Sequence, residues 1–229
     1  GMKIGLPAEF FSSEINSEVK SAVLAAAKKY EDMGAQLVEC SLPSLKYAVM
    51  AFYIIASADA SSNLARFDGI KFGYRSKNAE SYEELVRNSR NEAFGEEVKN
   101  RILLGNYALS QENYDSYFLK AHGLKQQLKR EYRSIFEACD AVLTPTTPTT
   151  AHGINDSIIN DPVAMYKSDF CTVSANLCSL PAISSTCGYD KNGMPIGFSL
   201  VGNRFTEATL IQLCDSFERD FNLVLPKNI

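Results

Sequence analysis

The chain has 229 residues, of which 45% are hydrophobic and 22% are charged, a composition typical of a globular protein with a sizeable core. Its formal net charge of −4 argues against a strongly basic nucleic-acid-binding surface. The longest uncharged apolar run, residues 47–58, is shorter than the roughly 20 residues that a membrane-spanning helix needs. Composition therefore favours a globular protein, of one domain or at most two, that does not span a membrane.

The first forty residues predict a strand–helix–strand unit. Residues 3–6 are expected to form a short strand, and a helix then begins at Asn16 or Ser17 and ends at Gly34. Residues 36–42 have the pattern of a second strand, which predicts that the two strands are parallel neighbours. Apolar side chains that recur at helical spacing are expected on the inner face of the helix: Val19, Val23, Ala26, Tyr30 and Met33.

The middle of the chain is predicted to be helical. The apolar spacing and the turn residues predict four helices, over residues 44–66, 81–94, 96–109 and 113–139. The last of these is the longest. Its side chains at steps of three or four are expected to face inward: Tyr114, Tyr117, Ala121, Leu124, Leu128, Tyr132 and Ile135.

The C-terminal third predicts a mixture of strands and helices. Asp161 followed by Pro162 indicates a helix start, since the carboxylate can cap free N–H groups and proline fits the first helical turn. The turn residues Asn192 and Gly193 separate two apolar strands. The predicted strands cover residues 141–143, 182–186 and 196–201, and a last helix over residues 206–221 is expected to bury Leu210, Leu213 and Phe217.

The cysteines do not suggest a metal site. All six are scattered, with no Cys-x-x-Cys pair, and the chain has only two histidines, so we expect no zinc centre. No signal peptide is visible, which favours reduced, buried thiols in a cytoplasmic protein. Gly1 before Met2 is typical of a cleaved expression tag, which predicts that the chain is a piece of a longer protein.

Two short patterns admit a catalytic interpretation and a simpler one. Residues 17–20 match the Ser-x-x-Lys pattern of penicillin-recognising enzymes, but the companion Ser-Asp-Asn and Lys-Thr-Gly motifs are absent, which favours a solvated helix start. His152 with Cys171 or Cys178 could form a thiol hydrolase dyad. Cysteines in an apolar run are more often structural, which is the interpretation that we favour.

Two charged residues in apolar surroundings suggest a site for a free amino acid. Arg101 precedes an apolar run, and Asp169 lies between Tyr166 and Phe170. A bound zwitterion needs a guanidinium for its carboxylate and a carboxylate for its ammonium, because each charged end is costly to desolvate without a partner. From the residues alone, an ordinary solvated or structural charge is the alternative interpretation at each position.

Several blocks, in one order along nearly the whole chain, resemble the A subunit of the glutamyl-tRNA(Gln)/aspartyl-tRNA(Asn) amidotransferases, a family of amidase-signature hydrolases. The first two blocks, residues 60–69 and 94–102, are specific to this subunit and do not occur in amidases in general. The blocks are residues 60–69 (ASSNLARFDG), 94–102 (FGEEVKNRI), 114–117 (YDSY), 143–146 (LTPT), 165–184 and 195–197 (PIG).

The resemblance implies the C-terminal part of the amidase-signature fold, an α/β fold with a mixed sheet flanked by helices, as a single region over residues 1–229. Family members cleave amides with two serines and a lysine, and the serines lie in and after a Gly/Ser-rich stretch that this chain lacks. We therefore expect no catalytic residue in this chain, and expect it to be inactive alone.

By resemblance, the chain recognises the glutamine that supplies ammonia. Arg101 is expected to bind the α-carboxylate and Asp169 the α-ammonium, with Phe52 nearby at a position where the family commonly has tyrosine. The implied partners are the B and C subunits, with mischarged tRNA reached through the partner. No cofactor is expected in this chain, and ATP and Mg are expected on the partner subunit. The alternative is a free-standing module that binds amino acids or a protein without chemistry.

Overall fold

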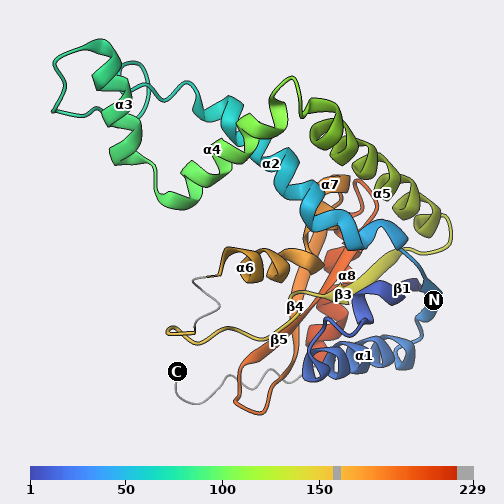
Figure 1. The fold of residues 1–229 in the computed structure, drawn as a ribbon. Helices are drawn as coiled ribbons and strands as arrows, with labels where there is room; N and C mark the ends of the chain where they lie inside the picture. Colours follow the sequence, from blue (N-terminus) through green and yellow to red (C-terminus); the bar gives the residue numbers. More distant parts are fainter. Residues whose placement is uncertain (157–160, 221–229) are drawn as a thin grey trace. The chain divides into compact units, whose positions relative to one another are not determined.

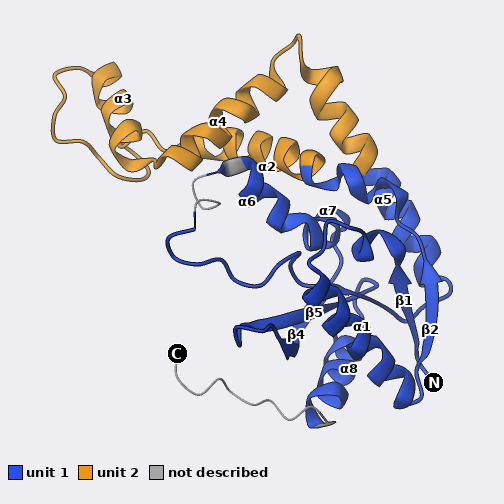
Figure 2. Cartoon of the chain, turned by 60° about the horizontal axis from the view of Figure 1, so that its bottom comes forward, with its two compact units in different colours: residues 1–49, 125–229 blue, residues 50–124 orange. Residues whose placement is uncertain are grey.

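The structure, a computed structural model, describes residues 1–156 and 161–220 (Figure 1). The chain divides into two compact units (Figure 2). The first unit comprises residues 1–49 and 125–229, and the second comprises residues 50–124. Since two compact units can belong to one domain, the single region over residues 1–229 stays a prediction, and each unit is described by itself.

The first unit is built on a mixed five-stranded sheet with the order β2-β1-β3-β5-β4. β1 is parallel to β2 and β3, whereas β5 is antiparallel to β3 and β4. This arrangement confirms the predicted mixed sheet and the parallel pairing of the first two strands. The strands are β1 (Lys3–Pro7), β2 (Gln36–Cys40), β3 (Ala141–Pro145), β4 (Ala182–Tyr189) and β5 (Pro195–Gly202).

Two helices, α1 (Ser17–Asp32) and α8 (Glu207–Asp220), pack against this sheet. Tyr30 of α1 lies with its ring centroid 5.4 Å from that of Phe217 on α8 and 6.0 Å from that of Phe198 on β5. Its hydroxyl donates to the Leu213 carbonyl oxygen at 3.0 Å. Phe217 also packs against Phe198, with ring centroids 4.8 Å apart, so both helices meet β5 on the same side and cover the same face of the sheet.

The predicted inner face of α1 is confirmed except at its end. Asn16 caps the helix, with its side-chain oxygen accepting from the Glu18 N–H at 2.8 Å, and Tyr30 and the apolar residues before it are buried. Met33, however, is 41% exposed. The helix ends at Asp32, and Gly34 turns the chain with a φ of +96°, so Met33 no longer follows the helical face.

The predicted helix over residues 113–139 is two segments. A π-helical turn, η3 (Tyr114–Leu119), precedes α5 (Lys120–Phe136). Leu128 and Tyr132 of α5 are buried as predicted. Tyr114 and Tyr117 are 38% and 40% exposed, so their predicted inward placement is wrong. The wider π-helical turn changes the residue spacing, and a 3.6-residue period no longer predicts which side faces inward.

The second unit is helical. It contains most of α2 (Ala48–Leu64), which follows a short 3₁₀ turn, η2 (Pro43–Tyr47), together with α3 (Tyr82–Ala93) and α4 (Glu96–Leu109). The bounds of α4 are those that the sequence predicted. α2 and α4 are in close contact, because a Cβ atom on Gly105 would collide with the Ser57 carbonyl. One turn further along α2, the Ser61 hydroxyl donates to Asn106 Oδ1 at 2.6 Å.

Residues 161–202 hold three further helical segments of the first unit: α6 (Pro162–Ser168), the 3₁₀ turn η5 (Asp169–Cys171) and α7 (Val173–Cys178). Another 3₁₀ turn, η1 (Ala8–Phe11), follows β1. The predicted start of α6 is confirmed, since Asp161 Oδ1 accepts from the N–H groups of Val163 and Ala164. α8 buries Leu210, Leu213 and Phe217 as predicted, whereas Phe221 lies outside the described residues. Within residues 1–156 and 161–220, no helix is both long and apolar enough to cross a bilayer.

Candidate functional site

Arg101, on α4, contacts Glu97 and Tyr53 within the second unit. Its Nε donates to Glu97 Oε1 at 2.8 Å, one helical turn earlier. Its guanidinium carbon lies 5.2 Å from the centroid of the Tyr53 ring on α2, at the distance of a cation–π contact. The side chain keeps 34% of its surface exposed. A guanidinium fixed in direction but still accessible is suited to binding a carboxylate.

Sequence reasoning missed Tyr53, the aromatic ring that Arg101 contacts. It is 8% exposed and packs edge-on against Phe52, with ring centroids 5.4 Å apart. Phe52 is half-buried. Apolar residues occupy all faces of α2, so the helical period did not show which aromatic ring would meet Arg101. The available signal was Gly105, one turn after Arg101, since a glycine inside a helix often marks a close helix–helix approach.

Asp169 lies in the first unit, where α6 gives way to η5. Its carbonyl oxygen accepts from both the backbone N–H and the hydroxyl of Thr172, at 2.9 and 3.1 Å. The residue is half-buried. Because α6 is anchored by the Asp161 cap and η5 by Thr172, the backbone that carries the Asp169 carboxylate is fixed on both sides.

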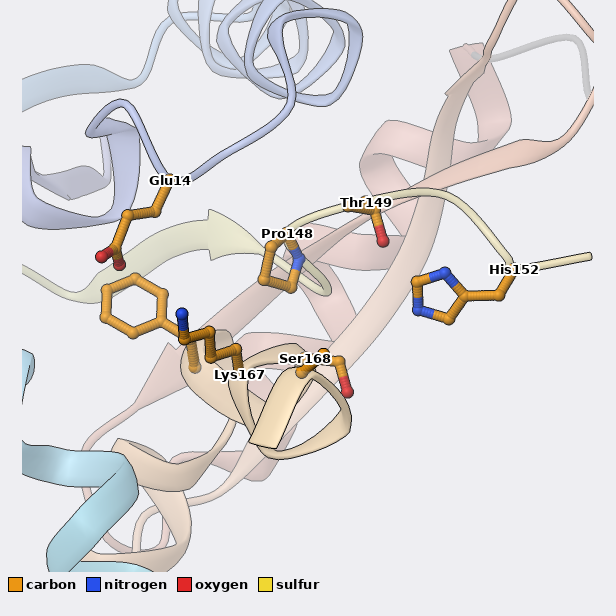
Figure 3. A pocket seen from close by; sticks show the side chains of 8 residues that line it. Glu14, Pro148, Thr149, His152, Lys167 and Ser168 are labelled. Carbon is orange, nitrogen blue, oxygen red and sulfur yellow. The ribbon is translucent and has the colours of Figure 1, made fainter. Parts of the chain in front are cut away.

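A cavity of about 310 Å³ lies beside Asp169 in the first unit, and the two neighbours of Asp169 contribute to its wall (Figure 3). Charged and polar side chains also surround it, with Glu14 and Lys167 toward one end and His152 at the other. The wall therefore offers an ammonium, an imidazole, hydroxyls and a carboxylate. Such a mixture can bind a small polar molecule that carries both donors and acceptors. The lining residues are Glu14, Pro148, Thr149, His152, Ala164, Lys167, Ser168 and Phe170.

The two expected zwitterion partners belong to different units, Arg101 to the second and Asp169 to the first. Phe52, the third expected site residue, belongs to the second unit. Each has the local environment given above within its own unit. Their joint action on one ligand stays a prediction.

The structure disfavours the thiol dyad. Cys171 and Cys178 are 3% and 2% exposed, and burial raises the pKa of each thiol to about 12. Near neutral pH such thiols are protonated and shielded, whereas nucleophilic catalysis needs a thiolate. The structural interpretation of these cysteines is the better one.

The Ser-x-x-Lys pattern is a helix start. Ser17 is exposed at the first position of α1, and Lys20 Nζ donates to the Phe11 carbonyl oxygen at 2.6 Å. The lysine is thus used to fix the preceding turn. Among the described residues, no group of three or more His, Cys, Asp or Glu side chains is placed to hold a metal ion.

The comparisons with known proteins agree over nearly the whole chain. The glutamyl-tRNA(Gln) amidotransferase A subunit of Halothermothrix orenii is 47% identical over 223 residues, which cover 97% of this chain and 46% of that protein. The corresponding A subunit of Persephonella marina is 44% identical over 229 residues, covering 99% of this chain and 47% of that protein. The chain spans about half the length of the curated relatives it matches.

Solved structures give the same result. The crystal structure of the glutamyl-tRNA(Gln) amidotransferase A subunit from Thermotoga maritima matches with a TM-score of 0.73 and 33% identity, over 97% of this chain and 43% of that one. A bacterial aryl acylamidase of the amidase-signature enzymes matches with a TM-score of 0.71 at 17% identity, which supports the fold alone. The family model described as Amidase matches residues 1–211. The chain therefore belongs to the amidase family.

Proposed function

We propose that this chain is the glutamine-recognising part of an amidotransferase subunit that releases ammonia from glutamine. The observation that carries the proposal is the 47% identity to the Halothermothrix orenii glutamyl-tRNA(Gln) amidotransferase A subunit across 97% of the chain. Identity at this level is far above the 16–20% shared with amidases of other specificity, so it supports a common substrate as well as a common fold.

Arg101 and Asp169 divide the recognition of glutamine between them. The guanidinium of Arg101 binds the α-carboxylate while Tyr53 and Glu97 keep it in place. The carboxylate of Asp169 binds the α-ammonium beside the 310 Å³ cavity. Each end of the zwitterion thereby exchanges water for a charged partner, which keeps the cost of desolvation low. Phe52 supplies an apolar contact near the ligand.

Cleavage of the glutamine side-chain amide needs a nucleophile that we do not assign to any of these 229 residues. No Gly/Ser-rich nucleophile stretch occurs in the sequence. Five of the six cysteines are buried, and burial raises the pKa of the sixth, Cys40, to about 12, so none of them is a candidate thiolate. We therefore assign no catalytic residue to this chain, and expect it to bind glutamine without hydrolysing it.

In the intact enzyme the ammonia is passed to a partner subunit. There ATP, with Mg, activates the side-chain carboxylate of glutamate or aspartate mischarged on tRNA. The B and C subunits are the expected protein partners, the mischarged tRNA is reached through them, and the cytoplasm is the expected compartment. The acidic balance of this chain, with 27 acidic and 23 basic residues, is consistent with a tRNA site located mainly on the partner.

The test is a chimera in which this chain replaces the region that it matches in the Halothermothrix orenii protein, assayed for ammonia release from glutamine. Arg101→Ala and Asp169→Ala should each raise the KM for glutamine by about 10- to 100-fold, the effect of losing one charge-assisted hydrogen bond to a ligand. Arg101→Lys should recover part of the loss, because it restores the charge but not the fork of donors.

Arg219→Ala is the matched control. Arg219 pairs with Asp215 one helical turn away at 2.9 Å, as Arg101 pairs with Glu97, so both variants lose the same kind of surface ion pair. Only Arg101→Ala should change KM. Equal KM values for the two variants would remove Arg101 from the site. Tight glutamine binding by the 229-residue chain in calorimetry, together with an inactive chimera, would instead favour a binding module without chemistry.

A further inference from the structure

The first unit contains a second cavity, of about 350 Å³, between α5 and the loop that follows β5. Three cationic side chains line it: Lys129 and Arg133 from α5, and Arg204 from the loop. The amides of Gln126 and Asn203 add further hydrogen-bonding groups. None of the described residues on its wall is an Asp or a Glu. The chain as a whole carries a net charge of −4, so this cavity is more positively charged than the average of the chain.

None of these three cations forms an ion pair with another described residue. The carboxylate that is nearest in sequence, Glu131, is engaged elsewhere. Its two oxygens accept from the Ser44 hydroxyl at 2.6 Å and the Ser44 N–H at 3.2 Å. The three cations on the cavity wall therefore have no ion-pair partner in the described part of the chain.

The cations are arranged so that they can act together. Lys129 and Arg133 are four residues apart on α5, so they lie on the same side of the helix, where two like charges repel. A bound anion would remove this repulsion. Arg204 is held in a fixed loop, since its N–H donates to Asn203 Oδ1 at 2.8 Å and the Thr206 hydroxyl donates to the Asn203 carbonyl oxygen at 2.7 Å.

A buried thiol on the cavity wall indicates the same positive field. Burial raises the pKa of Cys178 to about 12, and Glu131 raises it further, while Lys129, Lys125 and Arg204 act in the opposite direction. Positive charges from α5 (Lys125 and Lys129) and from the loop after β5 (Arg204) therefore act on the same thiol beside the cavity.

We infer that this cavity is an oxyanion site that holds a phosphate group. A guanidinium offers paired donors that match two phosphate oxygens, and the ammonium of Lys129 adds a third point of charge. The volume leaves room for a phosphate together with the group that carries it or its bound water. None of the three residues proposed to recognise glutamine, Arg101, Phe52 and Asp169, lines this cavity.

The experiment measures inorganic phosphate binding to the full 229-residue chain by calorimetry, with sodium chloride adjusted to keep the ionic strength constant. We expect saturable binding that Lys129→Gln and Arg204→Gln each weaken by about tenfold or more, as for the loss of one charge-assisted hydrogen bond. Lys28→Gln is the matched control, because it removes the same charge from an exposed lysine that pairs with Glu31 and Asp32. It should leave the phosphate affinity unchanged.

Thermal unfolding without phosphate identifies a variant that fails to fold, and Arg133→Gln then replaces it. Phosphate binding that does not saturate, or that falls equally in Lys28→Gln and Lys129→Gln, would overturn the inference. The source of the phosphate is decided with a short single-stranded RNA. RNA that displaces phosphate and binds more tightly, with both affinities reduced in Lys129→Gln, assigns the site to an RNA backbone. Phosphate that binds as tightly as the RNA, with the same dependence on Lys129, assigns it to a free phosphate.

Discussion

The contact between α2 and α4 makes a sharp prediction about Gly105. A Cβ atom at this position would collide with the Ser57 carbonyl and would lie 2.6 Å from Ser61 Cβ, and a backbone carbonyl cannot move away as a side chain can. Forcing a methyl group into a packed contact costs about 3 kcal/mol at the upper end of the usual range. Replacing glycine by alanine inside a helix returns about 1 kcal/mol. Gly105→Ala should therefore destabilise the chain by about 2 kcal/mol.

Gly123 provides the control in the same molecule. It lies inside α5, and an added Cβ atom would meet nothing within 4 Å. Gly123→Ala should then show the helix preference alone, a gain of about 1 kcal/mol. For a chain of this size about 2–4 °C in Tm accompanies each kcal/mol. Gly105→Ala should lower the Tm by about 4–8 °C, and Gly123→Ala should raise it by about 2–4 °C.

Urea unfolding followed by circular dichroism measures both variants, with the Tm as a second readout. The consequence for the site is that separating α2 from α4 moves Arg101, one turn before Gly105, away from Tyr53. In the chimera, Gly105→Ala should raise the KM for glutamine although the residue touches no ligand. If Gly105→Ala were as stable as Gly123→Ala, the close packing of the two helices would be refuted.

Three further predictions concern capping, the aromatic core and the thiols. Asp161→Ala should lower the free energy of unfolding in urea by about 1 kcal/mol, because two N–H groups of α6 lose their acceptor. Asp161→Asn should keep most of that free energy, because the asparagine side chain can still accept. Equal losses in the two variants would contradict the cap. Tyr30→Phe should cost about 1 kcal/mol through the lost bond to Leu213, and an unchanged urea midpoint would count against that bond. Burial raises the pKa of Cys171 to about 12, whereas the thiol of the unfolded chain has a pKa near 8.5–9. The buried neutral thiol therefore makes its full contribution to the unfolding free energy below about pH 8.5–9. This contribution is lost as the pH rises from there toward 12, because the unfolded chain then releases the proton more readily than the folded one. Unfolding free energy measured from pH 8 to 11 should fall less steeply in Cys171→Ala than in the wild type, and parallel curves would contradict the burial of this thiol.

Most of the architecture followed from local signals in the sequence. The Asp161–Pro162 start, the bounds of α4 and the buried face of α8 each depend on residues close together in the chain, where capping chemistry and helical period decide the outcome. The errors lie where the period breaks. A π-helical turn displaced Tyr114 and Tyr117, and the helix end at Asp32 released Met33.

The site was less accessible to sequence reasoning. Arg101 and Asp169 are predicted site residues because of their charge in apolar surroundings and the family resemblance, but their immediate partners could not be predicted. Tyr53 was hidden because α2 is apolar on every side, so no hydrophobic period shows which face meets α4. The phosphate cavity escaped because Lys129 and Arg133 look like an ordinary solvated helix face until Arg204, some seventy residues later, is found beside them.

We propose that this chain recognises glutamine but holds no group that can cleave it. The most direct measurement is the release of ammonia from glutamine by the purified 229-residue chain, with the chimera in the same assay as the positive reference. We expect no ammonia above the buffer blank from the chain alone and steady release from the chimera. Sustained turnover by the chain alone would contradict the proposal.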